Sequence, residues 1–195
     1  NGAIFQANIN TVFTSANVSF SNTTVGGTVT INTNTAIYAT NVVISNTQAG
    51  GTFDVAGTVT LAGTPTWSGG TWSGAGTVQV NPGTTLSLSG SNKFLGLANL
   101  VNQGTINWSS GAVTIFSDGT LNNQGRFDIQ GDLNWGRTQG VGPESSYSGP
   151  YTYTTTLLNS GTLVKSSGTG SATLGSMGDH YGNRYGYVNL ANSGT

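Results

Sequence analysis

Short segments in which apolar and polar residues alternate recur along the chain, each directly after a glycine. The phrase Gly-Thr-apolar-polar-apolar occurs at residues 27–31, 51–55, 57–61 and 76–80. Alternation with a period of two is typical of a β-strand that buries one face. Glycine adopts positive φ without a steric penalty, so it suits the turn before each strand. The pattern therefore predicts many short strands, with apolar side chains pointing inward and Thr, Asn or Gln pointing outward.

One phrase returns at a nearly constant step and identifies an internal repeat. Residues 100–108 read Leu-Val-Asn-Gln-Gly-Thr-Ile-Asn-Trp, and residues 121–129 read Leu-Asn-Asn-Gln-Gly-Arg-Phe-Asp-Ile. Neighbouring glycine-led segments lie six to eight residues apart, so three of them fit within one step. Stacked units of this length are typical of solenoid proteins. We predict an all-β fold, a β-solenoid with about three short strands per coil of roughly 21 residues.

Two interruptions of the repeat predict loops that leave the coils. The first covers about 136–156 and contains Pro143 and Pro150, which cannot donate a hydrogen bond within a central strand. The second covers about 175–188 and is rich in Gly and Tyr. No segment gathers helix-forming residues at helical spacing, so no helix is expected. We predict a single solenoid domain, 1–195, with these two excursions.

Composition narrows the classes of partner. Charged residues make up 6% of the chain, with five Lys and Arg against six Asp and Glu, a formal net charge of −1. Such a balance does not favour binding to nucleic-acid backbones or acidic membranes. The chain has 31 glycines and no cysteine, which excludes disulfides and cysteine metal sites. It also has no apolar run of about 18 residues, so we expect no membrane insertion.

The two ends of the chain favour stacking onto something further. The last residues, Asn192-Ser193-Gly194-Thr195, repeat the corner phrase without its following strand, and the first residues do not form a basic-then-apolar leader. We therefore expect a portion of something longer. An open coil end exposes unpaired backbone groups, and neither end reads as a cap. The expected partners are identical subunits or adjoining repeats, joined end to end.

Three stretches carry a resemblance to a known class of protein. Residues 67–77 (WSGGTWSGAGT), 121–125 (LNNQG) and 158–170 (LNSGTLVKSSGTG) resemble repeats of large bacterial surface proteins of the adhesin-like and autotransporter-like kind. The resemblance covers about residues 50–195. It implies a right-handed parallel β-helix exported to the cell surface, where it acts as a stalk, sheath or adhesin. We accordingly expect an extracellular structural or adhesive module, not an enzyme, with no cofactor.

Tyrosine is concentrated in or beside the two excursions. Six of the seven tyrosines lie there: Tyr147, Tyr151, Tyr153, Tyr181, Tyr185 and Tyr187. A tyrosine ring offers a flat apolar face and a hydrogen-bonding edge, which suits stacking on sugars or contact with a protein. The alternative is that the rings pack the loops onto the solenoid. These residues are our candidate binding site, and a carbohydrate-binding module is the alternative function. The four tryptophans occupy strand positions, and we expect them in the core.

Acidic and histidine residues give weaker signals of chemistry. Asp128 and Asp132 could approach each other, and polysaccharide-cleaving β-helix enzymes use clustered acids. The competing interpretation places Asp128 outward on a strand and Asp132 in a turn. His180 is the only histidine, which argues against a metal site made of several imidazoles and against a Ser-His triad. With Asp179 and Arg184 it forms either a small polar site or a solvated loop. No catalytic residue and no metal ligand is predicted.

Pairs of threonines at alternate positions raise one further alternative. Thr28-Val29-Thr30 and Thr58-Val59-Thr60 resemble the outward threonine rows of ice-binding β-helices, although threonine also has high β-propensity in general. The pairs stop after Leu61. Ice binding and polysaccharide cleavage therefore rank below the structural and carbohydrate-binding functions.

Overall fold

The computed structural model describes residues 11–13, 17–21, 24–25, 29–31, 36–40, 43–44, 52–115, 117–136, 151–175 and 184–195; up to residue 44, and at 151–153 and 184–187, it describes the backbone alone. These residues form strands and turns without any helix. Every strand pair among them is parallel. The prediction of an all-β chain that contains no helix is confirmed for this part of the chain.

The strands form three lines, which the chain visits in a fixed order. The first line contains β1 (Thr11–Phe13), β4 (Val29–Ile31), β7 (Thr52–Val55), β10 (Gly70–Val80), β12 (Lys93–Asn102), β14 (Val113–Ile115), β17 (Asn134–Gly136) and β20 (Thr173–Leu174). The second contains β2 (Asn17–Ser21), β5 (Ala36–Thr40), β8 (Thr58–Ala62), the later halves of β10 and β12, β15 (Gly119–Asn123), β18 (Tyr151–Asn159) and β21 (Arg184–Asn192). The third contains β3 (Thr24–Val25), β6 (Val43–Ile44), β9 (Thr66–Trp67), β11 (Thr85–Leu88), β13 (Thr105–Trp108), β16 (Arg126–Gln130) and β19 (Thr162–Ser167).

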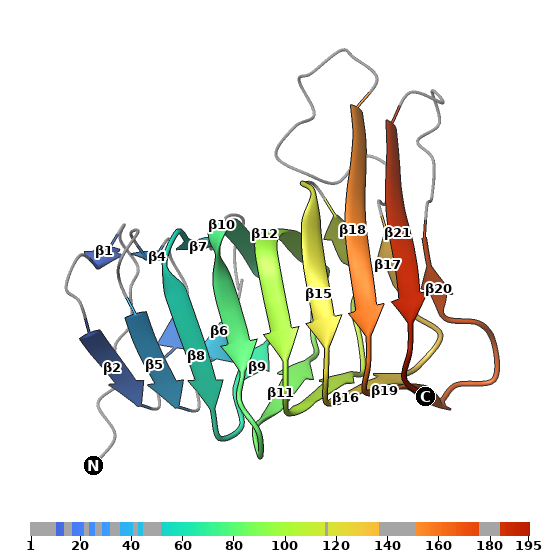
Figure 1. Ribbon diagram of the computed structural model, residues 1–195, viewed down its shortest axis with the longest axis horizontal. Coiled ribbons are helices and arrows are strands. Elements are labelled where there is room, and N and C mark those ends of the chain that lie inside the picture. Colours follow the sequence, from blue (N-terminus) through green and yellow to red (C-terminus); the bar gives the residue numbers. More distant parts are fainter. Residues whose placement is uncertain are drawn as a thin grey trace.

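We use the word circuit for one passage of the chain through the three lines. Because β10 and β12 each run through two lines, the first two lines form one 14-stranded sheet and the third forms a 7-stranded sheet. Figure 1 shows the second line, from β2 to β21, side by side along the long axis of the molecule. Neighbouring circuits thus cover one another along this axis.

The step of the sequence repeat corresponds to the pairing of equivalent residues in neighbouring circuits. Leu100 is paired with Leu121, and Asn102 with Asn123, at the step of 21 that the sequence repeat has. The step lengthens to 36 between Asn123 and Asn159, because the first excursion lies between them. The register of the second line is nevertheless kept, so equivalent residues stack in columns parallel to the long axis.

Alternate residues of the strands fill the interior between the lines. In β8, β11 and β13 buried and less buried residues alternate, as the sequence pattern predicts. All four tryptophans lie in the core, which confirms their predicted position: Trp67, Trp72, Trp108 and Trp135. The Trp67 and Trp72 rings stack with centroids 4.3 Å apart. Burying each such apolar side chain stabilises the fold by about 1.5 to 3 kcal/mol, so contacts between circuits provide most of the stability.

Strand structure enters both ranges that the sequence predicted as loops. Residues 151–156 belong to β18 and residues 184–188 to β21, so the predicted excursions 136–156 and 175–188 extend too far at their C-terminal ends. In Figure 1 both strands project beyond β15. Residues 151–154 have no partner in β15 and pair with residues 184–187 of β21. Thr and Tyr favour extended backbone, and each segment supplies the other with hydrogen-bonding partners. Pro143 lies outside the described residues.

Candidate functional site

The predicted tyrosine site falls only partly within the described structure. Tyr147 and Tyr181 lie outside it, as do Asp179 and His180. The backbone of the other four tyrosines is described: Tyr151 and Tyr153 in β18, and Tyr185 and Tyr187 in β21. Thr152 is paired with Tyr185, and Tyr153 with Gly186. The structure therefore joins two tyrosine-containing segments, which the sequence analysis had treated as separate loops, in one pair of parallel strands.

Asp132 lies in the turn between β16 and β17, where the sequence analysis placed it as one alternative. Its carboxylate lies 3.0 Å from the Lys165 ammonium and accepts a hydrogen bond from the Gly170 N–H at 3.0 Å. The hydrogen bond from Lys165, followed by that from Gly170, lowers the pKa of Asp132 below its ordinary value. Asp132 thus ties its own turn to the corner of the following circuit.

Asp128 lies between the core residues Phe127 and Ile129 of β16, as expected of an outward strand residue, but it is nevertheless buried. It is in register with Asn107 and Val164, and only 6% of its surface is exposed. Its neighbours on β16 cover it: the carboxylate lies 2.9 Å from the Arg126 guanidinium and accepts from Gln130 at 3.4 Å. Burial raises the pKa of Asp128, but hydrogen bonds from Ser166, Arg126 and Gln130 outweigh it, so the net pKa is low.

Each of these acids is therefore held by a cation on its own strand or in the following circuit. Both carboxylates are thereby engaged in contacts that serve local structure. Among the described residues, no group of three or more His, Cys, Asp or Glu side chains is placed to hold a metal ion.

A buried lysine near the middle of the chain links the corners of two neighbouring circuits. The Lys93 ammonium donates to the carbonyls of Ser91 at 2.8 Å and Ser110 at 3.0 Å, which belong to neighbouring circuits. Burial lowers the pKa of Lys93 to about 8. Sequence analysis missed this residue, since a single Lys beside a Gly-rich corner reads as solvent-exposed. Its place directly before the apolar alternation of β12 was the one available signal.

Four asparagines form a column at the end of the second line. The Asn102 amide donates to the Asn123 side-chain oxygen at 2.7 Å, Asn123 donates to Asn159 at 2.6 Å, and Asn159 donates to Asn192 at 2.6 Å. Asn102 and Asn123 also donate to backbone carbonyls of the following corner, those of Arg126 and Thr162, at 3.0 Å. The first three asparagines are buried. Each amide therefore satisfies buried acceptors of the next circuit.

A column of glycines follows two residues behind the asparagines. A Cβ on Gly125 would lie 2.0 Å from the Gly104 carbonyl oxygen, one on Gly161 would lie 2.1 Å from the Gly125 oxygen, and one on Gly194 would lie 2.1 Å from the Gly161 oxygen. None of these glycines has a positive φ. Sequence analysis assigned the corner glycines to positive φ; in this column the actual reason is the close approach of the preceding circuit's backbone.

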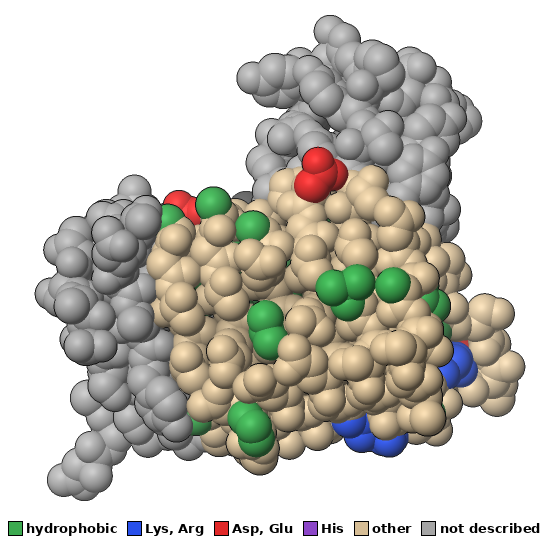
Figure 2. Space-filling model, viewed as in Figure 1, with side chains coloured by type: hydrophobic (Ala, Val, Ile, Leu, Met, Phe, Trp, Pro, Cys, Tyr) green, Lys and Arg blue, Asp and Glu red, His purple; other side chains and the backbone are tan. Residues whose placement is uncertain are grey.

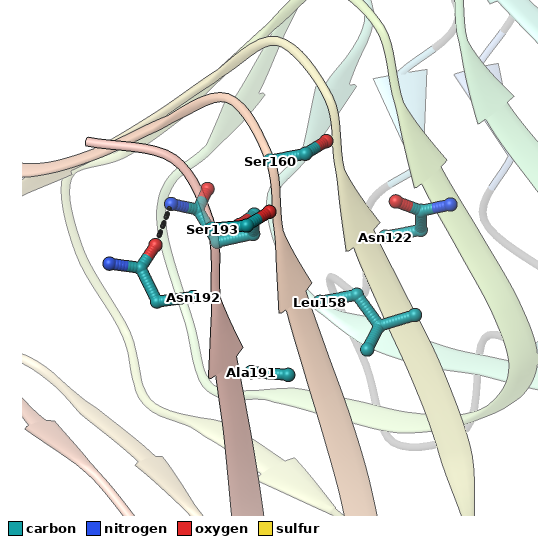
Figure 3. Close-up of a pocket in the computed structure, with 7 residues that line it drawn as sticks. Asn122, Leu158, Ser160, Ala191, Asn192 and Ser193 are labelled. Carbon is teal, nitrogen blue, oxygen red and sulfur yellow. Dashed lines mark hydrogen bonds between the residues drawn. The ribbon is translucent and has the colours of Figure 1, made fainter.

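The column ends at a shallow hollow beside β21. Seven residues line this hollow of about 240 Å³: Asn122, Leu158, Asn159, Ser160, Ala191, Asn192 and Ser193. Figure 3 shows Asn192 accepting the hydrogen bond from Asn159, with its own amide nitrogen directed away from the inner circuits. Pockets for cofactors are larger, about 300 to 1,000 Å³. The distinctive feature of this region is thus the uncovered end of the column.

The outer surface offers little charge. Figure 2 shows one face that consists mainly of uncharged polar side chains and backbone, with small, separate hydrophobic groups. On the second line, the row that contains Thr60 has Tyr38 before it and Gln79, Val101 and Asn122 after it. Thr30 lies in β4 of the first line, where it is paired with Asp54, so the described strands form no regular double row of threonines.

Comparison with protein-family models, with curated proteins and with solved structures found no match for this chain. The resemblance to repeats of bacterial surface proteins stays a prediction. In the part of the chain that the structure describes, no helix is long and apolar enough to cross a membrane.

Proposed function

We propose that the chain is a right-handed parallel β-helix that serves as an extracellular structural and adhesive module of a bacterial surface protein. It would stack end to end with identical subunits or adjoining repeats. The observation that carries this proposal is the last described circuit, which repeats the residues of the inner circuits and pairs, among the described strands, only with the circuit before it.

The order of the strands supports a winding chain. The three lines are visited in the same sequence in each circuit, every pairing is parallel, and the register of the columns survives both insertions. A coil of this kind buries its inward side chains only against neighbouring coils. Its ends are therefore the places where association stabilises it most.

The last circuit shows what an uncovered end exposes. Leu190 is 53% exposed, whereas Leu100, Leu121 and Leu157 in the same column are at most 2% exposed. Among the described strands, β19, β20 and β21 each pair on one side only, with β16, β17 and β18. An edge with free backbone groups and an apolar side chain is a template for another strand.

Association of the intact chain with itself tests this proposal. Light scattering and sedimentation over a concentration series should show rods that lengthen in whole-subunit steps. Leu190→Lys, which places a charge at the open edge, should abolish the association. Leu158→Lys is the matched control, because Leu158 is 39% exposed but faces outward beside the hollow instead of along the column.

The proposal would be overturned by a chain that stays monomeric at high concentration while the backbone amides of β21 are protected from hydrogen exchange. That combination means that something else already covers the edge. Loss of association in Leu158→Lys but not in Leu190→Lys would place the contact on the outer face instead.

Carbohydrate binding is the second candidate, and the β18–β21 pairing favours it. Residues 151–154 and 184–187 extend past β15 as a two-stranded projection and hold four of the six candidate tyrosines in their backbone register. In this register Tyr185 and Tyr187 are paired with Thr152 and Thr154, so each strand contributes its own two tyrosines at alternate positions. A tyrosine ring can stack on a sugar.

A glycan array with Tyr181→Ala and Tyr185→Ala tests this second candidate. The signal should fall in both variants and persist in Tyr38→Ala, since Tyr38 lies in β5, far along the chain from the projection. Equal signals in all three variants would indicate that these tyrosines pack against the protein and do not bind glycans.

A further inference from the structure

We propose that the open edge selects the chain segment that covers it, and that the segment must carry the sequence Leu-x-Asn-x-Gly. This inference rests on the proposed function, because it concerns the same edge. It adds which occupant the edge accepts: a further circuit of the same corner sequence, in the same register and direction. The interface that such a circuit would form already occurs three times inside the chain.

The glycine is required because of the backbone carbonyl that it meets. The glycine of each corner lies against the carbonyl oxygen of the glycine one circuit before it. A Cβ would come within 2.0 Å of that oxygen on Gly125 and within 2.1 Å on Gly161 and Gly194, which is too close for any side chain. The Gly194 carbonyl occupies the equivalent place at the open edge. Any side chain at that position of the incoming corner would force the two backbones apart.

The asparagine backbone provides a second element of selection. The Asn102 carbonyl accepts from the Gln124 and Gly125 N–H groups at 2.8 and 2.9 Å. The Asn123 carbonyl accepts likewise from Ser160 and Gly161, and the Asn159 carbonyl from Ser193 and Gly194. The Asn192 carbonyl has no such pair of donors within the described residues. It is therefore ready to receive the two N–H groups of another tight corner.

The asparagine side chain sets the register. Each inner amide donates along the column to the next asparagine oxygen, at 2.6 to 2.7 Å. The Asn192 amide nitrogen continues this direction past the last circuit (Figure 3). An incoming asparagine would accept from it, whereas a slipped register would place an outward residue there and leave the donor without a partner.

The leucine provides the apolar contact. Two residues before each asparagine stands a leucine, and these four form one column: Leu100, Leu121, Leu157 and Leu190. Only the last of them is substantially exposed, because the column ends there. A leucine in the incoming segment would bury Leu190 as Leu157 buries Leu121.

A lengthened chain tests the selection directly. Thr195 is in register with Thr162, whose next residue is Leu163. A second copy of residues 163–195 placed directly after Thr195 therefore continues the repeat without a linker. Hydrogen exchange measured by mass spectrometry on the original residues 188–195 should slow by about 10-fold or more relative to the natural chain.

Two substitutions made only in the added copy separate selection from simple tethering. Gly194→Ala in that copy should restore fast exchange in the original residues 188–195. Ser193→Gln in that copy is the matched control and should leave the protection intact, because Gln124 occupies the equivalent position of an inner corner and its N–H group bonds the Asn102 carbonyl as that of Ser193 bonds the Asn159 carbonyl. Equal protection in both variants would overturn the proposed selection.

The outcomes also separate this inference from the proposed function. Lengthened chains that show the Gly194→Ala effect while natural chains remain monomeric support the selection and contradict self-association. Natural chains that associate, with Gly194→Ala in the added copy having no effect, support end-to-end stacking and contradict the selection. A lengthened chain without added protection in residues 188–195 contradicts the selection outright.

Discussion

The inner corners and the last corner of the second line contain nearly the same residues in different surroundings. Residues 121–125 (LNNQG) lie between two circuits, and their Leu121 and Asn123 are buried. Residues 190–194 (LANSG) have a circuit on one side only, and Leu190 and Asn192 are exposed. The pair shows that burial in this fold comes from the neighbouring circuit, not from the side chain's own strand.

The same difference separates residues that specify the fold from residues that are available for binding. Asn123 and Asn159 each accept a hydrogen bond from the preceding asparagine and donate one to the next, so replacing either disturbs the circuits on both sides. The last asparagine contacts one circuit and has a free donor direction. Repeated sequence therefore produces a stable interior and a selective end with the same chemistry.

The largest expected difference is between the two leucines of the column. Leu121→Ala should lower the free energy of unfolding by about 3 kcal/mol, because it leaves a cavity between two circuits. Leu190→Ala should lower it by about 0.5 kcal/mol, since an exposed side chain loses little on truncation. Chemical denaturation of dilute protein measures both. Equal losses would mean that Leu190 is covered in solution.

The asparagine column should give the next largest difference. Asn123→Ala removes an acceptor for the buried Asn102, a donor for the buried Asn159 and a donor for the partly buried Thr162 carbonyl, at a cost of about 2 kcal/mol. Asn192→Ala loses one hydrogen bond at an exposed site, at a cost of about 0.5 kcal/mol or less. The same denaturation series measures both, and a costly Asn192→Ala would contradict an open column.

Substitution of two buried tryptophans distinguishes the contribution of packing to stability from that of hydrogen bonding. The Trp108 N–H donates to the Gly111 carbonyl at 2.8 Å, whereas the buried Trp72 N–H has no acceptor in the described structure. Trp108→Phe should therefore cost about 1 kcal/mol more than Trp72→Phe. Thermal unfolding of both variants measures the difference, and the opposite order would show that cavity formation outweighs the hydrogen bond.

Lys93 should have the smallest effect on the free energy of unfolding, and that effect depends on pH. Its folded pKa of about 8 lies below its ordinary value of 10.5, so above pH 8 the folded chain loses this proton before the unfolded chain does. The unfolded state then binds more protons, and stability rises with pH. Unfolding free energies at pH 7.5, 8.5 and 9 should rise more in the natural chain than in Lys93→Met. Parallel pH curves would contradict the burial of a charged Lys93.

The sequence was sufficient to predict the strands, the step between circuits and the inward tryptophans. Each follows from local spacing: alternate apolar residues require one buried face, and a constant step requires equivalent environments. It did not predict that Arg126 and Gln130 bury the outward Asp128, and it failed for the ends of the excursions, where residues 151–154 and 184–187 extend as strands by pairing with each other. Neither contact has a signature in the spacing of residues.

The sequence by itself thus determined which residues form strands and which of them face inward. Only the tertiary structure decided which equivalent residues are covered, because cover comes from a circuit roughly 20 residues or more away along the chain. The tertiary structure also explains why the corners beside the asparagine column require glycine. That reason is a carbonyl oxygen of the preceding circuit about 2 Å from where a Cβ would be, a distance that depends on how closely two circuits stack.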